Sequence, residues 1–177
     1  IMERHVFYDL GNGDFYLEKL LLLDDGFLKI NGEKFDIEEL KSRIDRKQIR
    51  TSLPKNSRFS IHAVGYKFLV DEETWTSIKE VELIKEFQDE MAVMNGELSS
   101  ADRCMAAFRS FLLDVENEEL RKKLEDAYLS IPEHNRRYVL GDMDSKDYPI
   151  RWAIDSSTPK DEGTVNMYYR EFFGRFE

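Results

Sequence analysis

The side chains best suited to chemistry are concentrated in one stretch, residues 131–155. This stretch combines an imidazole, several guanidinium groups and closely spaced carboxylates, which are groups that move protons, bind anions or bind metal ions. Its chemically capable members are His134, Arg136, Arg137, Asp142, Asp144, Asp147 and Arg151. These residue types predict two kinds of candidate site, a metal site built from the aspartates and an anion site built from the basic residues.

The aspartates Asp142, Asp144 and Asp147 have the spacing i, i+2 and i+5. Carboxylates at such positions on an irregular segment can converge on Mg²⁺ or Ca²⁺, because both ions prefer oxygen ligands. The segment does not match an EF-hand loop, since its sixth position is not glycine and its twelfth is Ala153. The alternative, which we favour, is that these aspartates shape turns or cap a following segment. No cofactor is therefore predicted beyond this Mg²⁺ or Ca²⁺ candidate.

The basic residues His134, Arg136 and Arg137 precede the aspartates on a predicted short helix. Two guanidinium groups can hold a phosphate or a carboxylate, and His134 is the candidate for proton transfer near neutral pH. Arg151, after the aspartates, is a third candidate ligand for an anion. The alternative, which we favour, is local ion pairing between these arginines and the neighbouring aspartates, which contributes little to stability when the pairs are exposed.

A second charged feature is segment 41–58, which has a net charge of +6 in a chain whose net charge is −10. A basic ridge is the footprint expected for nucleic acid or another anionic partner. However, Phe59 is the only adjacent aromatic residue, so stacking platforms are missing. Residues 71–90, with a net charge of −6, can neutralise the ridge in the fold or across a dimer. Nucleic acid is therefore a disfavoured partner. The candidate patch is Lys41, Arg43, Arg46, Lys47 and Arg50.

Several function classes lack their motifs in this sequence. Cys104 is the only cysteine, so neither an intramolecular disulfide nor a zinc spacing is present. No GxSxG, GxGxxG or Walker motif occurs. The sequence shows no secretory signal and no apolar run of membrane-spanning length, which predicts a cytoplasmic protein with no membrane partner.

The first part of the chain has the patterns of strands. Asn31-Gly32 between two short apolar runs is a strong hairpin signal, and Asp36 predicts the start of a short helix over 37–44. Apolar alternation and apolar runs predict strands over residues 4–9, 14–23, 27–30, 33–37, 48–53 and 58–70, with a bulge at Gly65.

From residue 72 onward, apolar residues recur at steps of three and four, which predicts helices. The first helix is expected over 72–94, and Ser99 and Asn117 are expected to cap two further helices that pack as an antiparallel hairpin. A short helix is expected from Pro132 to Gly141 and an irregular segment over 142–149, and Thr158-Pro159 with Asp161 is expected to start a final helix. The aromatic stripe of the final helix predicts docking on the core, with self-association as the alternative. Its members are Tyr168, Tyr169, Phe172, Phe173 and Phe176.

These patterns predict an α+β protein, with an antiparallel, partly curled sheet (3–71) packed against a bundle of four to five helices (72–177). We expect residues 2–177 to form a single compact domain. The leading functional hypothesis is a non-enzymatic interaction or regulatory module that binds a protein partner or itself, as a homodimer, through residues 134–152. One alternative is a metal-assisted hydrolase or nucleotide-handling enzyme using the three aspartates. The other is a nucleic-acid binder using the basic segment.

Overall fold

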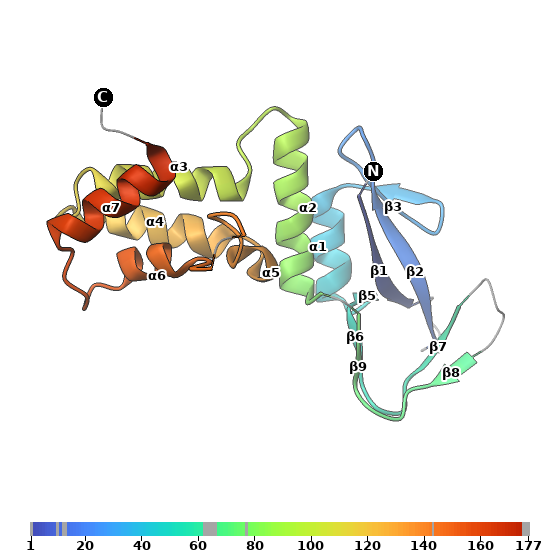
Figure 1. The fold of residues 1–177 in the computed structure, drawn as a ribbon. Coiled ribbons are helices and arrows are strands. Elements are labelled where there is room, and N and C mark those ends of the chain that lie inside the picture. Colours follow the sequence, from blue (N-terminus) through green and yellow to red (C-terminus); the bar gives the residue numbers. More distant parts are fainter. Residues whose placement is uncertain are drawn as a thin grey trace. The chain divides into compact units, whose positions relative to one another are not determined.

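The secondary structure of the chain is strand-rich at first and helical afterwards (Figure 1). The structure is a computed structural model. It describes residues 2–9, 11, 14–61, 67–76, 78–142 and 144–174. The chain divides into two compact units, Ile1–Met94 and Asn95–Glu177. The α+β class is confirmed, with a curled antiparallel sheet near the amino terminus and helices toward the carboxy terminus. That both parts form one domain stays a prediction.

The centre of the sheet is a long antiparallel pair, β1 (Met2–Asp9) and β2 (Phe15–Leu22). The two strands are paired over their whole length, and β5 (Ile49–Arg50) lies on the other edge of β1. In the leucine run of β2, Leu20 and Leu22 are buried and Leu21 between them is half-buried. This part of β2 has a paired strand on each edge, β1 on one side and residues 28–29 on the other.

The predicted hairpin at Asn31-Gly32 is confirmed. It joins β3 (Leu28–Ile30) to β4 (Glu33–Phe35) in antiparallel pairing. The φ angles of Asn31 and Gly32 are 50° and 80°, which is the left-handed region that the tight hairpin turns require. Through β3, the hairpin extends the sheet from the Leu21–Leu22 end of β2.

The region 58–70 differs from the single long strand predicted for it. Instead, β7 (Arg58–Ser60) pairs with the beginning of β2 in parallel, and β8 (Lys67–Leu69) pairs with β7 antiparallel. A period of two does not distinguish a continuing strand from two strands that pair with each other. The predicted bulge at Gly65 lies outside the described residues.

The long helix of the first unit also begins later than predicted. Residues Thr74–Trp75 form strand β9, which pairs with β6 (Ser52–Leu53), and the helix α2 covers Glu80–Met94. Its Leu83 and Phe87 share one apolar core with Leu20, Leu22 and the other strand residues. The helix α1 (Ile37–Asp45) adds Leu40 and Ile44 to this core, so the two helices of this unit cover the sheet.

The second unit contains α3 (Ser100–Leu112) and α4 (Glu118–Ser130), which pack side by side (Figure 1). The predicted caps are confirmed, because the Ser99 hydroxyl accepts the Asp102 N–H at 3.1 Å and the Asn117 side chain accepts the Glu119 N–H at 3.1 Å. Among the described residues, no helix of the chain combines the length and the apolar character that crossing a membrane requires.

The remaining helices are α5 (Glu133–Arg136), α6 (Tyr148–Ile154) and α7 (Glu162–Phe173). The described chain between residues 80 and 173 thus has six helices, one more than the upper number expected. The additional helix is α6, which begins within the segment predicted to be irregular. Its proline occupies the first turn, where a missing N–H costs little.

The aromatic stripe of α7 packs on the core of its own unit. Tyr168 and Tyr169 are buried, and the rings of Phe172 and Phe173 lie 6.1 and 5.9 Å from the ring of Phe108 on α3. The prediction that these residues dock on the core is therefore confirmed for the described members of the stripe. Phe176 lies outside the described residues.

Candidate functional site

A surface hollow of about 690 Å³ lies where the end of α4 meets the start of α6. It is lined by Tyr128, Arg137, Asp144, Ser145, Lys146, Asp147, Tyr148 and Arg151. A neighbouring hollow of about 370 Å³ shares Tyr128 and Arg151 with the first. The second hollow adds Glu125, Leu129, Ile154 and Asp155. We use the term basic-aromatic surface for Tyr128, Leu129, Arg137, Tyr138, Lys146, Tyr148 and Arg151.

Asp147 lies beneath this surface, and its side chain is largely buried. The Tyr128 hydroxyl donates a hydrogen bond to one oxygen of this carboxylate, and the Arg151 Nε lies 3.4 Å from the other. Burial and the bond to Asp147 raise the pKa of Tyr128 to about 12, so the phenol is neutral at physiological pH. The carboxylate therefore ties α4 to α6 and orients Arg151.

The cations of the surface differ in how they are held. Lys146 donates to Asp142 and lies 5.3 Å from the centre of the Tyr138 ring. The Arg137 guanidinium lies 5.9 Å from that ring centre. Within the described part of the chain, no hydrogen bond engages the guanidinium of Arg137, and Arg151 makes only its contact with Asp147. Arginine N–H donors are therefore open at this surface.

Arg136, although adjacent to Arg137, has a different role. Its Nε and one terminal nitrogen donate to the backbone carbonyls of Ile131 and Leu129 at 3.0 and 2.9 Å. It therefore caps the carboxy-terminal end of α4 and does not line either hollow. His134 is exposed on α5 and does not line them either. Arg137 and Arg151 line the same hollow, whereas the guanidinium of Arg136 lies 5.7 Å from the centre of the Tyr128 ring.

The three aspartates have separate partners or positions. Asp142 is exposed and bonded to Lys146, whose charge lowers the pKa of this carboxyl group. Asp144 is exposed at the edge of the hollow, and Asp147 is bonded to Tyr128. In the residues that the structure describes, no set of three or more His, Cys, Asp or Glu side chains is arranged to hold a metal ion. Asp142 and Asp147 thus have side-chain partners of their own, and the role of these aspartates in shaping turns stays a prediction.

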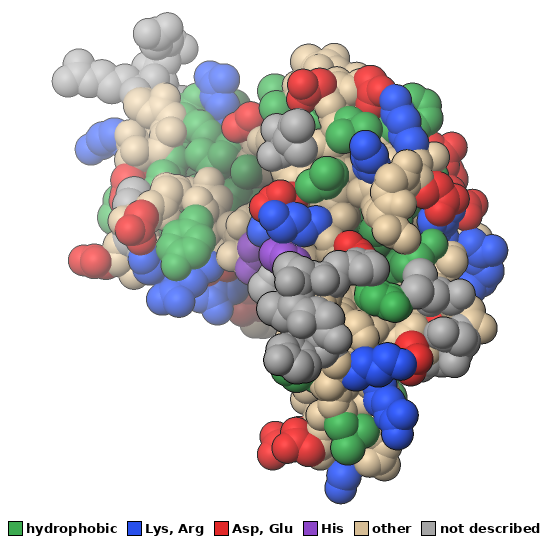
Figure 2. Space-filling model, turned by 90° about the vertical axis from the view of Figure 1, so that its right-hand side faces the viewer, with side chains coloured by type: hydrophobic (Ala, Val, Ile, Leu, Met, Phe, Trp, Pro, Cys, Tyr) green, Lys and Arg blue, Asp and Glu red, His purple; other side chains and the backbone are tan. Residues whose placement is uncertain are grey.

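The basic segment of the first unit is paired with glutamates close to it in sequence. Lys41 contacts Glu38 at 3.0 Å, and Arg46 contacts Glu39 at 3.1 Å. Arg43, whose side chain is only 7% exposed, bonds to Glu33 and Glu39. Bonding to Glu33 raises the pKa of Arg43. On the face that Figure 2 presents, basic and acidic side chains are interspersed.

The other two members of the candidate patch have different surroundings. Lys47 is exposed, and Arg50 is half-buried near Glu80 at the start of α2. Burial opposes ionisation of Glu80, but the Thr51 N–H, 3.0 Å from its carboxylate, and the charge of Arg50 leave its pKa lowered. The neutralising carboxylates therefore come mainly from residues 33–39, and the expected segment 71–90 contributes at Glu80.

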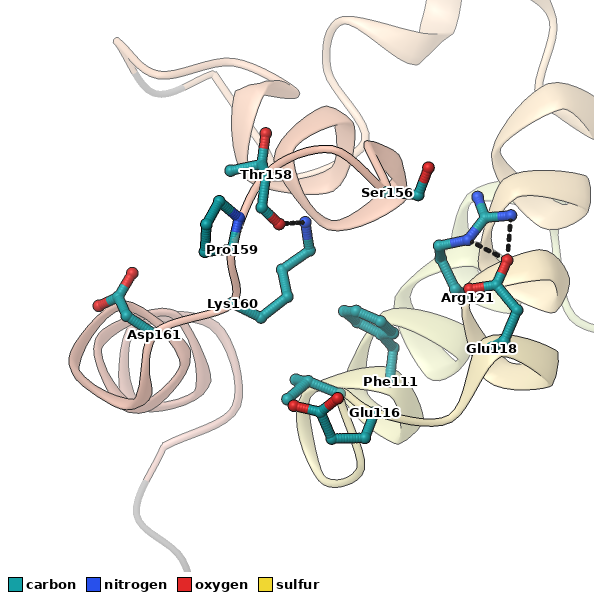
Figure 3. Close-up of a pocket in the computed structure, with 10 residues that line it drawn as sticks. Phe111, Glu116, Glu118, Arg121, Ser156, Thr158, Pro159, Lys160 and Asp161 are labelled. Carbon is teal, nitrogen blue, oxygen red and sulfur yellow. Dashed lines mark hydrogen bonds and ion pairs between the residues drawn. The ribbon is translucent and has the colours of Figure 1, made fainter.

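A further hollow, of about 490 Å³, lies beside the segment between α6 and α7 (Figure 3). Its two cations are already engaged. Arg121 bonds to Glu118, Glu125 and the Ile154 carbonyl, and Lys160 donates to the carbonyls of Asp155 and Thr158, both at 2.6 Å. Burial lowers the pKa of Lys160. No pattern in the sequence predicts this hollow, because its residues come together only through packing of the second unit.

Comparison with known protein families assigns both parts of the sequence. Residues 2–98, more than half of the chain, match the family described as Domain of unknown function (DUF7638). The chain belongs to the DUF7638 family. Residues 99–171 match a second family, Domain of unknown function (DUF7639). The junction of the two matches lies close to the junction of the two structural units. Searches of curated proteins and of solved structures gave no match.

Proposed function

We propose that this DUF7638 protein is a non-enzymatic interaction module that binds a protein partner through the basic-aromatic surface of its second unit. The observation that carries the proposal is the exposure of two tyrosines beside open arginines. Tyr138 and Tyr148 are 49% and 55% exposed, and Leu129, which lines the neighbouring hollow, is 47% exposed. Tyrosine and arginine are the residue types that concentrate binding energy in protein interfaces.

The arrangement of the acidic groups also supports binding rather than catalysis. Asp147, the most buried carboxylate of the surface, already accepts from Tyr128 and contacts Arg151. A general base must have a lone pair within reach of the proton it removes. Because Asp147 is engaged in holding α4 and α6 together, its role in this proposal is to keep the binding residues in place.

Site-directed photo-crosslinking in a lysate of the source cells tests this proposal. A photo-crosslinking amino acid in place of Tyr148 should give a discrete product that contains one partner protein, identified by mass spectrometry. The matched control carries the same amino acid in place of Met167, which is 53% exposed on α7 of the same unit. A product made of two copies of this chain would identify the partner as the protein itself. Equal crosslinking from both positions, or none from position 148, would contradict the proposal.

A further inference from the structure

We propose that the basic-aromatic surface binds an acidic segment of its partner, in which carboxylates flank one apolar residue. This inference rests on the proposed function and adds the chemistry of the partner. It is drawn from the open donors of two arginines in the first hollow and from the apolar lining of the second.

The arginines supply the recognition of carboxylates. Arg137 and Arg151 line the same hollow, and the Arg151 side chain is 61% exposed. In the described residues, the only ion pair of Arg151 is the 3.4 Å contact of its Nε with Asp147, and its terminal nitrogens make no hydrogen bond to any of these residues. A guanidinium presents its donors in a planar fork that matches a carboxylate in bidentate pairing. Two such forks in one hollow favour an occupant with more than one carboxylate.

The cations of the hollow differ in how far neighbouring carboxylates already pair with them. The lining of the hollow includes three cations, Arg137, Lys146 and Arg151, and two carboxylates, Asp144 and Asp147. Lys146 already donates to Asp142, and Arg151 contacts Asp147, so the charges of the three cations and of Asp142, Asp144 and Asp147 balance. The N–H donors of Arg137 and Arg151 are what the hollow offers to a carboxylate. The whole chain has a net charge of −10, so it repels polyanions at long range. A short acidic segment can bond to the arginine donors while avoiding most of that repulsion.

The neighbouring hollow supplies the apolar part. Tyr128, Leu129 and Ile154 present apolar surface there, beside the shared Arg151. The two acidic residues of this hollow already have partners. Glu125 accepts from Arg121 at 2.8 Å, and Asp155 accepts from Ser157 and Thr158. An apolar side chain can therefore be buried over Leu129 while an adjacent carboxylate reaches Arg151.

Fluorescence anisotropy with the full chain tests this inference. The probe is a short fluorescein-labelled peptide in which glutamates flank one leucine, compared with peptides in which glutamine replaces glutamate or serine replaces leucine. We expect binding of the glutamate–leucine peptide that weakens as salt is raised, and weaker binding of both altered peptides. The double variant Arg137→Gln/Arg151→Gln should bind on the order of 10-fold more weakly, because each change removes charge-assisted bonds.

The matched control is the double variant Lys123→Gln/Arg170→Gln, which removes the same charge at exposed positions of α4 and α7 in the same unit. It should retain wild-type affinity. An equal loss in both double variants would reduce the effect to net charge and overturn the inference, as would the absence of peptide binding. If crosslinking at position 148 still captures a partner in that case, the proposed function stands and only the acidic chemistry of the partner is wrong.

Discussion

The two basic regions of this protein differ in what occupies their hydrogen-bond donors. In the first unit, Arg43 is buried and bonded to Glu33 and Glu39. In the second unit, Arg137 and Arg151 line a hollow with donors that no described residue accepts. The first region has the larger net charge in sequence, yet the second has the unpaired arginine donors on which the proposed interface rests. The net charge of a segment therefore does not show which of its cations are already paired.

Removal of a paired cation should have the largest effect on stability. Arg43→Ala should lower the free energy of unfolding by about 2 kcal/mol, because it removes buried aliphatic packing, two ion pairs and the contact with the Phe35 ring 4.3 Å away. Urea unfolding monitored by circular dichroism measures this change. The control Lys47→Ala, at an exposed position, should remain within about 0.5 kcal/mol of wild type. Equal effects at the two positions would remove the distinction between paired and exposed cations.

Loss of the hydrogen bond between Tyr128 and Asp147, which orients Arg151, should have the next largest effect on stability. Tyr128→Phe removes the donor to Asp147 and leaves a largely buried carboxylate with Arg151 as its remaining partner. We expect a loss of about 1–2 kcal/mol in the free energy of unfolding, measured in the same urea experiment. The control Tyr138→Phe, at an exposed ring whose hydroxyl has no described bond, should cost much less. If the two variants are equally stable, Asp147 does not depend on Tyr128.

The pairing of the first unit also predicts a dependence on pH. The pKa of Glu80 is lowered from 4.5 in the folded state, so its carboxylate stabilises the fold above that value and loses this contribution as the pH falls through the folded pKa. Glu80→Gln should therefore lower the melting temperature at pH 7, and the difference from wild type should shrink in acid below about pH 4.5. Thermal melts across this range provide the measurement. A difference that grows as the pH falls would show that the sign is wrong.

The smallest effect on stability should come from the open arginines themselves. Arg137→Gln/Arg151→Gln should change the free energy of unfolding by no more than about 0.5 kcal/mol, because Arg137 makes no described hydrogen bond and Asp147 keeps its bond from Tyr128 when the 3.4 Å contact of the largely exposed Arg151 side chain is lost. The same urea titration measures this value. A large loss of stability would place these arginines among the structural cations and remove the contrast with Arg43.

Features set by a few adjacent residues were predicted well from the sequence. Asp36, Ser99 and Asn117 each accept a backbone N–H at the predicted helix starts, and the turn at Asn31-Gly32 has the expected backbone. Each of these depends on local geometry alone. The division of 58–70 into two strands depends on the pairing of β7 with β2 and β8. The pairing with β2 joins residues far apart in sequence, so the local pattern does not predict it.

The candidate site was predicted only in its location. The segment containing Arg137, Asp147 and Arg151 was identified from residue types, but its internal pairing depends on Tyr128, which belongs to another helix. Arg136 and Arg137 are adjacent residues of the same type, so the sequence does not distinguish them. They differ because the carbonyl groups at the end of α4 lie within reach of Arg136, which donates to them. The partners of a flexible side chain are decided by the backbone around it, so adjacent arginines can differ completely.

The pairing of β2 has a consequence for how this protein reaches its native state. One edge of β2 is taken by β1, while the other is divided between β3 at one end and β7 at the other. Pairing β1 with β2, or β3 with β4, closes only a short loop. Pairing Phe15 with Phe59 closes a much longer loop, which contains β3, β4 and α1. Because loop closure costs more entropy as the loop lengthens, we expect the hairpins to assemble early and the parallel contact to form last. The three strands that pair with β2 should therefore join it in an order set by the length of the loop that each pairing closes.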